Sequence, residues 1–559
     1  MCGICYWLVL RFNDDPYKSN DLHEALKHRG PDSQGRVVLT PSRRCCMEFL
    51  AGVLHLRGAH CTAQPIQNDR ENTFLWNGEV FDGFAVDKDE NDTKIIFENL
   101  NKCSNDDEIL STIAQIRGPW AFVFWQANVQ KLWFGRDYFG RRSLLWHVSS
   151  NDESQFQFGL SSVADSIHNW NEVPASGVYC LSVAQTIKDQ KLSLVAYCWH
   201  QEPDIPPPYC KSFLLDAIGE LKIPQFTSAK IDYNERLKPP IRRLNREMPV
   251  ELFLDETNAE KFASLLKASV RKRTENIALG KDLKPKLGVL FSGGIDSMVI
   301  AALAHKTFPE GEPIDLLNVA FEQKVPADQY AVPDRKTGLA GFEELSAAFP
   351  TRKWNFVQID VTRAELQEMR ETRIRRLVYP LCTVLDDSIG CALWFASRGT
   401  GTNGSDGLCP YQSSAKVLLA GMGADEQLAG YSRHRNAFKQ GSWKSLVNEI
   451  ENDVCRISFR NLGRDDRCIS DHGKEARFPF LDEEVVDYLH SLPMWSKADL
   501  RLPRGQGEKR LLRNVATLLG LPGCSRLPKR AIQFGTRIAK LEGGQSEKGS
   551  DTCTRLKSV

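Results

Sequence analysis

The second half of the chain predicts an α/β fold built on a doubly wound parallel sheet, and three observations support this prediction. Residues 287–305 contain, in order, a short apolar run typical of a buried strand, a Ser-Gly-Gly turn and a helical segment. Residues 316–321 and 353–359 are further candidate strands, with a helical stretch at 339–349 between them. Such alternation is typical of parallel sheets, in which ligands bind outside the carboxyl ends of the strands.

Length and composition exclude several functional classes. A chain of 559 residues is too long for one hydrophobic core, so we expect either about three or four domains of average size or two large ones. The net charge of +1 predicts no binding of nucleic acid or of an anionic membrane. The basic clusters at 373–376 and 529–530 are interpreted as solvated faces or anion contacts. Sixteen irregularly spaced cysteines, with no signal peptide or membrane span, favour a cytoplasmic protein with reduced thiols.

The Ser-Gly-Gly turn has the properties of an anion site. It joins a strand to a helix N-terminus, where free backbone N–H groups and the helix dipole attract phosphate. It lacks the lysine and the spacing of a Walker A sequence, and a glycine turn of any α/β domain is the alternative. The motif Ser-Gly-Gly-x-Asp-Ser resembles the pyrophosphate loop of ATP pyrophosphatases, which implies that Asp296 binds Mg²⁺. The ATP-binding residues that this resemblance implies here are Phe291, Ser292, Gly293, Gly294, Asp296 and Ser297.

The first residues of the chain predict a cysteine nucleophile. Removal of Met1 would expose Cys2, whose own α-amino group can act as the base for its thiol. One alternative is an ordinary start followed by a cysteine. Another is a metal or redox pair formed with Cys5, but no second pair follows at zinc spacing.

Four further motifs place this cysteine in a known context. The sequences HRGPD at 28–32, NGE at 77–79, NDT at 91–93 and RDYFGRRS at 136–143 occur in this order among apolar strands. Together with Cys2 they resemble the N-terminal-nucleophile glutamine amidotransferases over about the first 165 residues. The resemblance implies an αββα sandwich that hydrolyses glutamine to ammonia, and we place this domain at residues 1–190.

The chemistry of amide hydrolysis explains the residue types in these motifs. Attack on a carboxamide produces an oxyanion, which the side-chain amide of Asn77 and the backbone N–H of Gly78 can stabilise. The resemblance implies that Arg57 binds the α-carboxylate of glutamine, that Asp92 binds its ammonium group and that Glu79 lies beside the oxyanion pair. A hairpin turn is the alternative interpretation of the Asn-Gly pair.

The remaining motifs resemble the asparagine synthetases over residues 256 to about 540. They are a second glycine loop at 416–426, the sequence EARFPFLD at 475–482 and the sequence EKRLLR at 508–513. The resemblance implies that Asp425 is a second Mg²⁺ ligand and that Lys509 neutralises the leaving group. It also adds three ATP contacts, namely Val319, Ala420 and Gly421. We expect a proline-containing linker at 191–255 and a disordered tail at 541–559.

The combined prediction is synthesis of an amide from glutamine, Mg-ATP and a carboxylate, most strongly aspartate, through an acyl-adenylate with internal passage of ammonia. Met422 departs from the family pattern, because it stands where the resemblance places a glutamate. Asp386 or Asp387 is the hypothetical substitute that meets the acceptor's ammonium, with capping residues as the alternative. Two other functions stay open: a ligase for another carboxylate, and a non-catalytic scaffold. The sequence predicts no oligomeric state.

Overall fold

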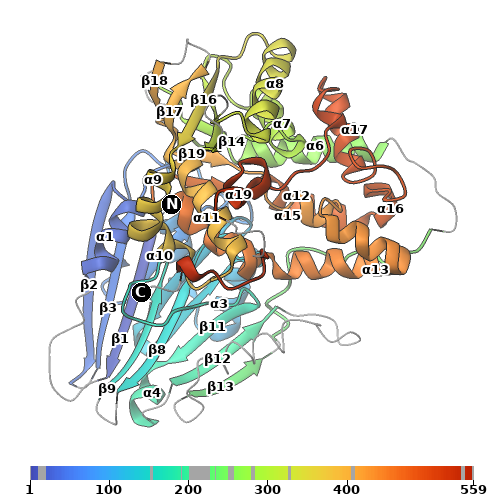
Figure 1. The fold of residues 1–559 in the computed structure, drawn as a ribbon. Helices are drawn as coiled ribbons and strands as arrows, with labels where there is room; N and C mark the ends of the chain where they lie inside the picture. Colours follow the sequence, from blue (N-terminus) through green and yellow to red (C-terminus); the bar gives the residue numbers. More distant parts are fainter. Residues whose placement is uncertain are drawn as a thin grey trace.

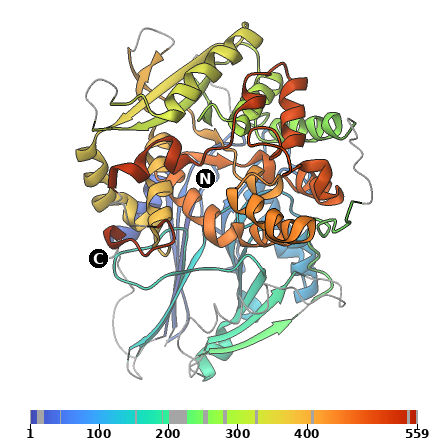
Figure 2. The same cartoon turned by 45° about the vertical axis from the view of Figure 1, so that its right-hand side comes forward.

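The computed structural model describes residues 2–10, 20–43, 45–151, 155–189, 192–199, 227–232, 234–249, 257–277, 284–324, 329–404, 409–542 and 548–556. Figure 1 shows two parts, one built from two twisted sheets and one from a sheet surrounded by helices. The start of the chain lies where these parts meet, in both views (Figures 1 and 2). Among the described helices, none combines the length and apolarity that a membrane crossing requires.

The first part is a sandwich of two mainly antiparallel sheets. One sheet has the order β10-β8-β9-β1-β3-β2 and the other has the order β13-β12-β11-β7-β6-β5-β4. The strands are β1 (Gly3–Leu10), β2 (Ser33–Ser42), β3 (Cys45–Val53), β4 (Ile66–Gln67), β5 (Thr73–Gly78), β6 (Trp120–Gln126), β7 (Lys131–Arg136), β8 (Leu145–Asn151), β9 (Gln155–Ser161), β10 (Asn171–Glu172), β11 (Gly177–Ser182), β12 (Leu192–Cys198) and β13 (Thr227–Asp232).

Alternation of side chains along each strand explains the layers of this sandwich. In β1, Ile4, Tyr6 and Leu8 enter the core between the sheets, whereas Cys5 and Trp7 face the opposite side. Helix α1 (Asn20–Arg29) covers that outer side of the first sheet. Helices α2 (Asp92–Lys102) and α3 (Asp106–Gln115) pack against the outer face of the second sheet. The predicted αββα arrangement is therefore confirmed.

The second part contains a mixed sheet with the order β18-β17-β16-β15-β14-β19-β20. The five strands β16, β15, β14, β19 and β20 are parallel. Strands β17 and β18 form an antiparallel edge. The strands are β14 (Leu287–Leu290), β15 (Ile314–Phe321), β16 (Trp354–Val361), β17 (Thr400–Asn403), β18 (Cys409–Gln412), β19 (Val417–Leu419) and β20 (Glu475–Arg477). The predicted doubly wound sheet is confirmed, with the antiparallel edge as an addition.

Helices surround this sheet on both sides and form most of the upper part of Figure 1. The first strand-turn-helix unit joins β14 to α7 as predicted, and the next unit joins β15 to α8 and β16. The longer helices are α6 (Thr257–Lys272), α7 (Ile295–Thr307), α8 (Pro333–Ala348), α11 (Val384–Arg398), α13 (Ser432–Ile457), α14 (Gly463–Ser470), α15 (Glu483–Ser491) and α17 (Arg510–Leu518). Shorter ones are α4 (Val183–Asp189), α9 (Arg363–Met369), α10 (Arg375–Val378), α12 (Ala424–Gln427), α16 (Met494–Lys497), α18 (Ile532–Gly535) and α19 (Ile538–Glu542).

Buried ion pairs join the two parts. Arg29 contacts Asp466 at 2.8 Å, and Arg142 contacts Glu475 at 3.1 Å, with every side chain at most 2% exposed. A buried charge is costly unless it is paired, so losing either partner should separate the two surfaces. These contacts place β20 and α14 of the second part directly against the sandwich.

Two predicted boundaries differ from the structure. Strand β12 continues the second sheet beyond residue 190, because its apolar residues alternate toward the sandwich core. Most of the predicted linker lies outside the described residues. In the predicted disordered tail, residues 548–556 lie against the start of α11: the Cys553 amide donates to the Cys382 carbonyl at 2.7 Å, and Cys553 is fully buried. This cysteine supplies the apolar contact that the polar composition of the tail does not predict.

Candidate active sites

The first candidate site surrounds Cys2, directly before β1. The Cys2 nitrogen donates to Oδ1 of Asn77 at 3.1 Å, and Nε2 of Gln64 lies 3.5 Å from the Cys2 sulfur. While residue 1 is attached, this nitrogen is a peptide amide, and cleavage after Met1 converts it to the α-amino group that the predicted mechanism needs. The structure therefore brings the predicted nucleophile and Asn77 together.

Asn77 and Gly78 present the predicted oxyanion donors at the end of β5. Asn77 is fully buried, and its Nδ2 has no hydrogen-bond partner among the described residues. The Glu79 amide donates to Pro119 on the β6 side, so the preceding amide of Gly78 points to the opposite edge of β5. A side chain at Gly78 would place Cβ 2.7 Å from the Pro119 oxygen, which explains the glycine. Two donors are thus free to bind an oxyanion.

Gln64 holds this edge of β5 in place, and the sequence analysis did not identify it. Its Oε1 accepts from the Trp76 amide at 2.7 Å and its Nε2 donates to the Trp76 carbonyl at 3.0 Å. The side chain thus replaces a neighbouring strand beside the oxyanion donors. No motif around Gln64 indicates this role, since it depends on contact between segments 12 residues apart.

The predicted glutamine ligands lie around the same small cavity. Arg57 donates to the carbonyls of Val80 at 2.9 Å and Val86 at 2.8 Å, so its two terminal nitrogens are already engaged. Its Nε has no partner among the described residues. Asp92 accepts from the Val80 amide at 3.0 Å, in the first turn of α2. Each terminal nitrogen carries a second N–H besides the one engaged here, so the guanidinium can still bind the predicted carboxylate.

The cavity beside Cys2 is small and its carboxyl groups are buried. Its volume is about 30 Å³, and its lining includes Cys2, Arg57, Gly78 and Asp92. Burial raises the pKa of Glu79 to about 7, although Arg477 opposes the shift. Burial also raises the pKa of Glu475, but Arg477 and Arg142 outweigh it and hold the value at about 2. Glu475 belongs to β20, so the second part contributes to this site.

The second candidate site begins at the predicted phosphate loop between β14 and α7. Gly293 has φ +72°, and a Cβ there would lie 2.2 Å from the Thr337 carbonyl oxygen. Gly294 precedes the helix as its N-cap, and the Ser297 hydroxyl donates to its carbonyl at 3.0 Å. The two glycines therefore allow a close turn that opens the helix N-terminus toward the cleft.

A cluster of two aspartates and two lysines closes the end of this loop. Lys509 Nζ lies 2.6 Å from Asp296 and 2.6 Å from Asp425. Lys529 pairs with Asp425 and lies 3.7 Å from Asp296. Burial alone would raise the pKa of Asp425, but Lys509 and Lys529 outweigh it and hold the pKa well below the usual range. Both predicted metal ligands therefore reach a common cation position.

These aspartates fit Mg²⁺ only together with other ligands. No group of three metal-ligating side chains occurs among the described residues. Magnesium in nucleotide sites is commonly held by one or two carboxylates, with phosphate oxygens and water completing the shell. Asp296 and Asp425 match that donor set, with Lys509 as the cation that they share in this structure.

Gly430 leaves the space that the charged cluster occupies, because it has no side chain. A Cβ at this position would lie 1.9 Å from an Asp425 oxygen and 2.6 Å from Cε of Lys509. Lys509 itself has φ +55°, in the left-handed region that side chains rarely adopt. Its neighbours over-determine this conformation, as is common at functional sites.

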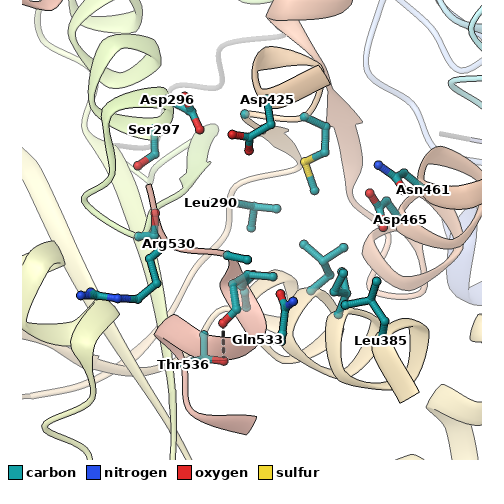
Figure 3. A pocket seen from close by; sticks show the side chains of 18 of the residues that line it. Leu290, Asp296, Ser297, Leu385, Asp425, Asn461, Asp465, Arg530, Gln533 and Thr536 are labelled. Carbon is teal, nitrogen blue, oxygen red and sulfur yellow. Dashed lines mark hydrogen bonds between the residues drawn. The ribbon is translucent and has the colours of Figure 1, made fainter. Parts of the chain in front are cut away.

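A cleft of about 340 Å³ extends from this cluster across the carboxyl ends of the strands. Figure 3 shows Asp296 and Asp425 facing each other at its upper end, with Leu385, Asn461 and Asp465 on one wall. Of the predicted ATP and metal residues, those that line the cleft are Phe291, Ser292, Asp296, Ser297, Val319, Gly421 and Asp425.

Several predicted residues lie behind the cleft wall instead of lining it. Gly293 and Gly294 shape the turn, Ala420 is 1% exposed, and Lys509 supports the aspartates from behind. Asp387 is wrong as an acceptor contact, because it is fully buried and accepts from Arg370 at 2.9 Å. Asp387 lies in the first turn of α11, on a side of the helix that is buried in the protein.

Of three further charged cleft residues, Asp386 was named in the sequence analysis, whereas Lys529 and Asp334 were given no specific role there. Asp386 lines the cleft, but it caps α11 and pairs with Arg464 at 2.7 Å, as the capping alternative predicts. Lys529 belongs to a basic pair interpreted only as a solvated face or an anion contact. Asp334 lines the cleft at the start of α8, and burial raises its pKa to about 7. The sequence signals were the capping pattern for Asp386 and the basic pair for Lys529.

Comparison with known proteins agrees with this architecture. Residues 1–193 match the glutamine amidotransferase domain family, and residues 261–457 and 439–542 match the asparagine synthase family. The asparagine synthetase domain-containing protein 1 of Bos taurus is 45% identical, with 100% of this chain and 99% of that protein covered. The chain belongs to the asparagine synthetase domain-containing protein 1 family.

Members of the asparagine synthetase domain-containing family occur well beyond vertebrates. The Drosophila melanogaster protein named asparagine synthetase domain-containing protein CG17486 is 35% identical, covering 96% of this chain and 98% of its own length. The glutamine-hydrolysing asparagine synthetase of Mus musculus is 24% identical, covering 95% of this chain and 82% of its own length. The matches confirm the predicted family and the order of its two domains.

Proposed function

We propose that this chain is a glutamine-dependent ligase that converts a carboxylate to its amide and splits ATP to AMP and pyrophosphate. The observation that carries the proposal is the position of β20. Glu475 of this strand lines the cavity beside Cys2, and β20 pairs in parallel with β19, which leads into Gly421 of the cleft. One pair of neighbouring strands therefore connects both sites.

The first half-reaction follows from the groups around Cys2. After removal of Met1, the free amino group takes the thiol proton, and the thiolate attacks the carboxamide carbon of glutamine. The oxyanion that forms is stabilised by the unpartnered Asn77 amide and the Gly78 N–H. The ammonium group formed on Cys2 returns its proton to the leaving nitrogen, the C–N bond breaks to release ammonia, and water then hydrolyses the thioester to glutamate and free thiol. Burial raises the pKa of the Cys2 thiol, so its internal base is essential.

The second half-reaction uses the cleft. Mg²⁺, held by Asp296 and Asp425, would neutralise phosphate charge when bound. The loop at 292–294 and the α7 N-terminus bind the pyrophosphate group, and Lys509 and Lys529 balance the charge that develops on it. An acceptor carboxylate oxygen attacks the α-phosphorus, pyrophosphate leaves, and ammonia then displaces AMP from the acyl carbon.

A labile acyl-adenylate explains why the two sites share one chain. Ammonia that passes between β20 and the sandwich reaches the adenylate without dilution or protonation in water. The ion pairs of Arg29 with Asp466 and of Arg142 with Glu475 hold these surfaces together. Internal transfer of ammonia is therefore part of the proposal.

Pyrophosphate release is the direct test. The purified chain should release pyrophosphate from Mg-ATP when given a carboxylate acceptor and either glutamine or ammonium. Cys2→Ala should abolish the glutamine-supported reaction and spare the ammonium-supported one. A folded protein that neither binds Mg-ATP nor releases pyrophosphate would favour the scaffold alternative instead.

Aspartate as the acceptor stays a prediction. The family suggests it, and the murine relative is named an asparagine synthetase. Against it, Met422 lines the cleft at the position where the resemblance expects a glutamate, and its thioether cannot pair with an ammonium group. The residues around Met422 therefore bear on the identity of the acceptor.

A further inference from the structure

The wall of the cleft opposite the phosphate loop has an apolar surface. Leu385 and Ile389 of α11 and Met422 after β19 line the cleft and are all partly exposed to it. Leu393 and Ile457 also line the cleft, although they are only 1% and 2% exposed. Figure 3 shows Leu385 on the side of the cleft away from Asp296 and Ser297. This apolar wall, defined as Leu385, Ile389 and Met422, faces the space that an acceptor must occupy.

The charged groups beside the apolar wall are already paired with one another. Arg464 contacts Asp386 and Asp465, each at 2.7 Å. Arg433 contacts Asp453 at 2.6 Å, stacks 4.1 Å from the Tyr431 ring centroid and is thereby fixed in place. Arg464 is 3% exposed and would have to leave buried partners before it could bind a second carboxylate, whereas Arg433 is 48% exposed and therefore discriminates weakly between ligands.

Glu426, which lines the cleft four residues after Met422, is occupied as well. Glu426 accepts from the Tyr431 hydroxyl at 2.7 Å, from the Asn461 amide at 3.1 Å and from the Gly423 amide at 3.1 Å. Arg460 lines the rim, but it is exposed, and an exposed charge discriminates weakly between ligands.

The apolar wall and the paired charged groups beside it disfavour a small acceptor with two further charges, such as aspartate. The α-carboxylate and ammonium of aspartate would lose water against Leu385 and Met422, and the polar groups of the cleft beside them would have to exchange their present partners to bind them. A hydrocarbon body gains from the same surface, since burial of each methylene improves binding by about fourfold.

We propose that the acceptor is a monocarboxylic acid with an aliphatic body, held by Leu385, Ile389 and Met422 with its carboxylate toward Asp296 and Asp425. This assignment rests on the proposed function. The acid's oxygen attacks the α-phosphorus of ATP, which forms the acyl-adenylate and releases pyrophosphate. Ammonia then attacks the acyl carbon, AMP leaves with the electron pair of the broken C–O bond, and the nitrogen loses one proton to give a primary amide.

The test compares acids of increasing chain length with aspartate. Purified full-length protein receives Mg-ATP and ammonium chloride, which bypasses Cys2, and pyrophosphate release is measured with straight-chain acids from acetate to octanoate. We expect kcat/KM to rise by about fourfold per methylene until the wall is covered, and aspartate to give only the rate without acceptor.

Variants locate the effect on the apolar wall. Met422→Glu should lower kcat/KM for octanoate by at least about tenfold, the usual lower range for one changed pocket contact. Leu385→Asn should act in the same direction, which protects the test if one variant fails to fold. Leu518→Glu makes a comparable change at a residue 55% exposed on α17 and outside the cleft, and should leave the rate unchanged. Binding of a non-hydrolysable ATP analogue should stay within about twofold in all three.

The outcomes separate this inference from the function on which it rests. Pyrophosphate release with aspartate that equals or exceeds release with octanoate overturns the aliphatic acceptor and leaves the ligase intact. An absent trend with chain length, or no use of any acid by a protein that binds the ATP analogue, also overturns it. Failure to bind the analogue at all contradicts the ligase proposal itself.

Discussion

Replacement of Asn77 by alanine tests the geometry of the thiol site. In the structure, Oδ1 of Asn77 accepts from the Cys2 nitrogen at 3.1 Å, whereas Nδ2 has no partner among the described residues. An unpaired buried donor next to a nucleophile is expected if the donor binds the reaction's oxyanion. Its removal should lower kcat for glutamine hydrolysis by about 10² to 10³, or about 2.7–4 kcal/mol of transition-state stabilisation.

The same change has a smaller structural cost that must be separated from catalysis. Loss of Oδ1 leaves the part-buried Cys2 nitrogen without its acceptor, which should reduce the free energy of unfolding by about 1 kcal/mol. Glutamate production by the mature protein is therefore measured well below the melting temperature of the variant. Asn99→Ala, which removes an amide from α2 that donates to the Ile95 carbonyl at 2.8 Å, is the matched control.

The assignment of Asn77 also predicts where no effect should occur. Ammonium-supported pyrophosphate release does not use the oxyanion site and should be unchanged in Asn77→Ala. If kcat for glutamine hydrolysis stays within about threefold of wild type while the protein is folded, Nδ2 does not stabilise the oxyanion and the donor geometry argued from β5 is refuted.

Three further outcomes follow from the two sites. Gly430→Ala should abolish pyrophosphate release but not glutamine hydrolysis, because its Cβ would displace Asp425 and Lys509; an active variant would show that the cluster tolerates rearrangement. Because burial raises the pKa of Glu79 to about 7, its carboxylate is lost as pH falls below that value, so KM for glutamine should increase from about pH 8 to pH 6 in wild type but not in Glu79→Gln. Lys529→Ala removes one of two cations beside Asp425, so Mg²⁺ alone should raise the melting temperature of this variant more than that of wild type; equal shifts would count against a shared cation position.

Periodicity and turn chemistry were sufficient to predict the parallel sheet. The apolar strand, the glycines and the helix between 287 and 305 each carry their signal within a few residues, and the structure has β14, the turn and α7 in that order. The layers of the sandwich came from resemblance, whereas Cys2 was predicted as a nucleophile from its place after Met1. The structure brings Cys2 and Asn77 into contact.

Contacts between distant segments could not be predicted in this way. Gln64 has its role only because it lies along β5, and Lys529 only because the chain after α17 returns to Asp425. For other residues, burial of the side chain determines whether it can contact a ligand. The sequence was compatible with Asp387 as an acceptor contact, but in the structure its side chain accepts a hydrogen bond from Arg370. No local pattern encodes such partners.

The most direct test of the central claim measures glutamate and pyrophosphate in the same reaction. Wild-type protein with glutamine, Mg-ATP and an acceptor acid should form both. Cys2→Ala should form neither with glutamine but regain pyrophosphate release with ammonium, whereas Asp296→Asn should lose pyrophosphate release under every condition and keep hydrolysing glutamine. Glutamate formation that survives Cys2→Ala, or pyrophosphate release that survives Asp296→Asn, would contradict the account of two separate sites on one chain.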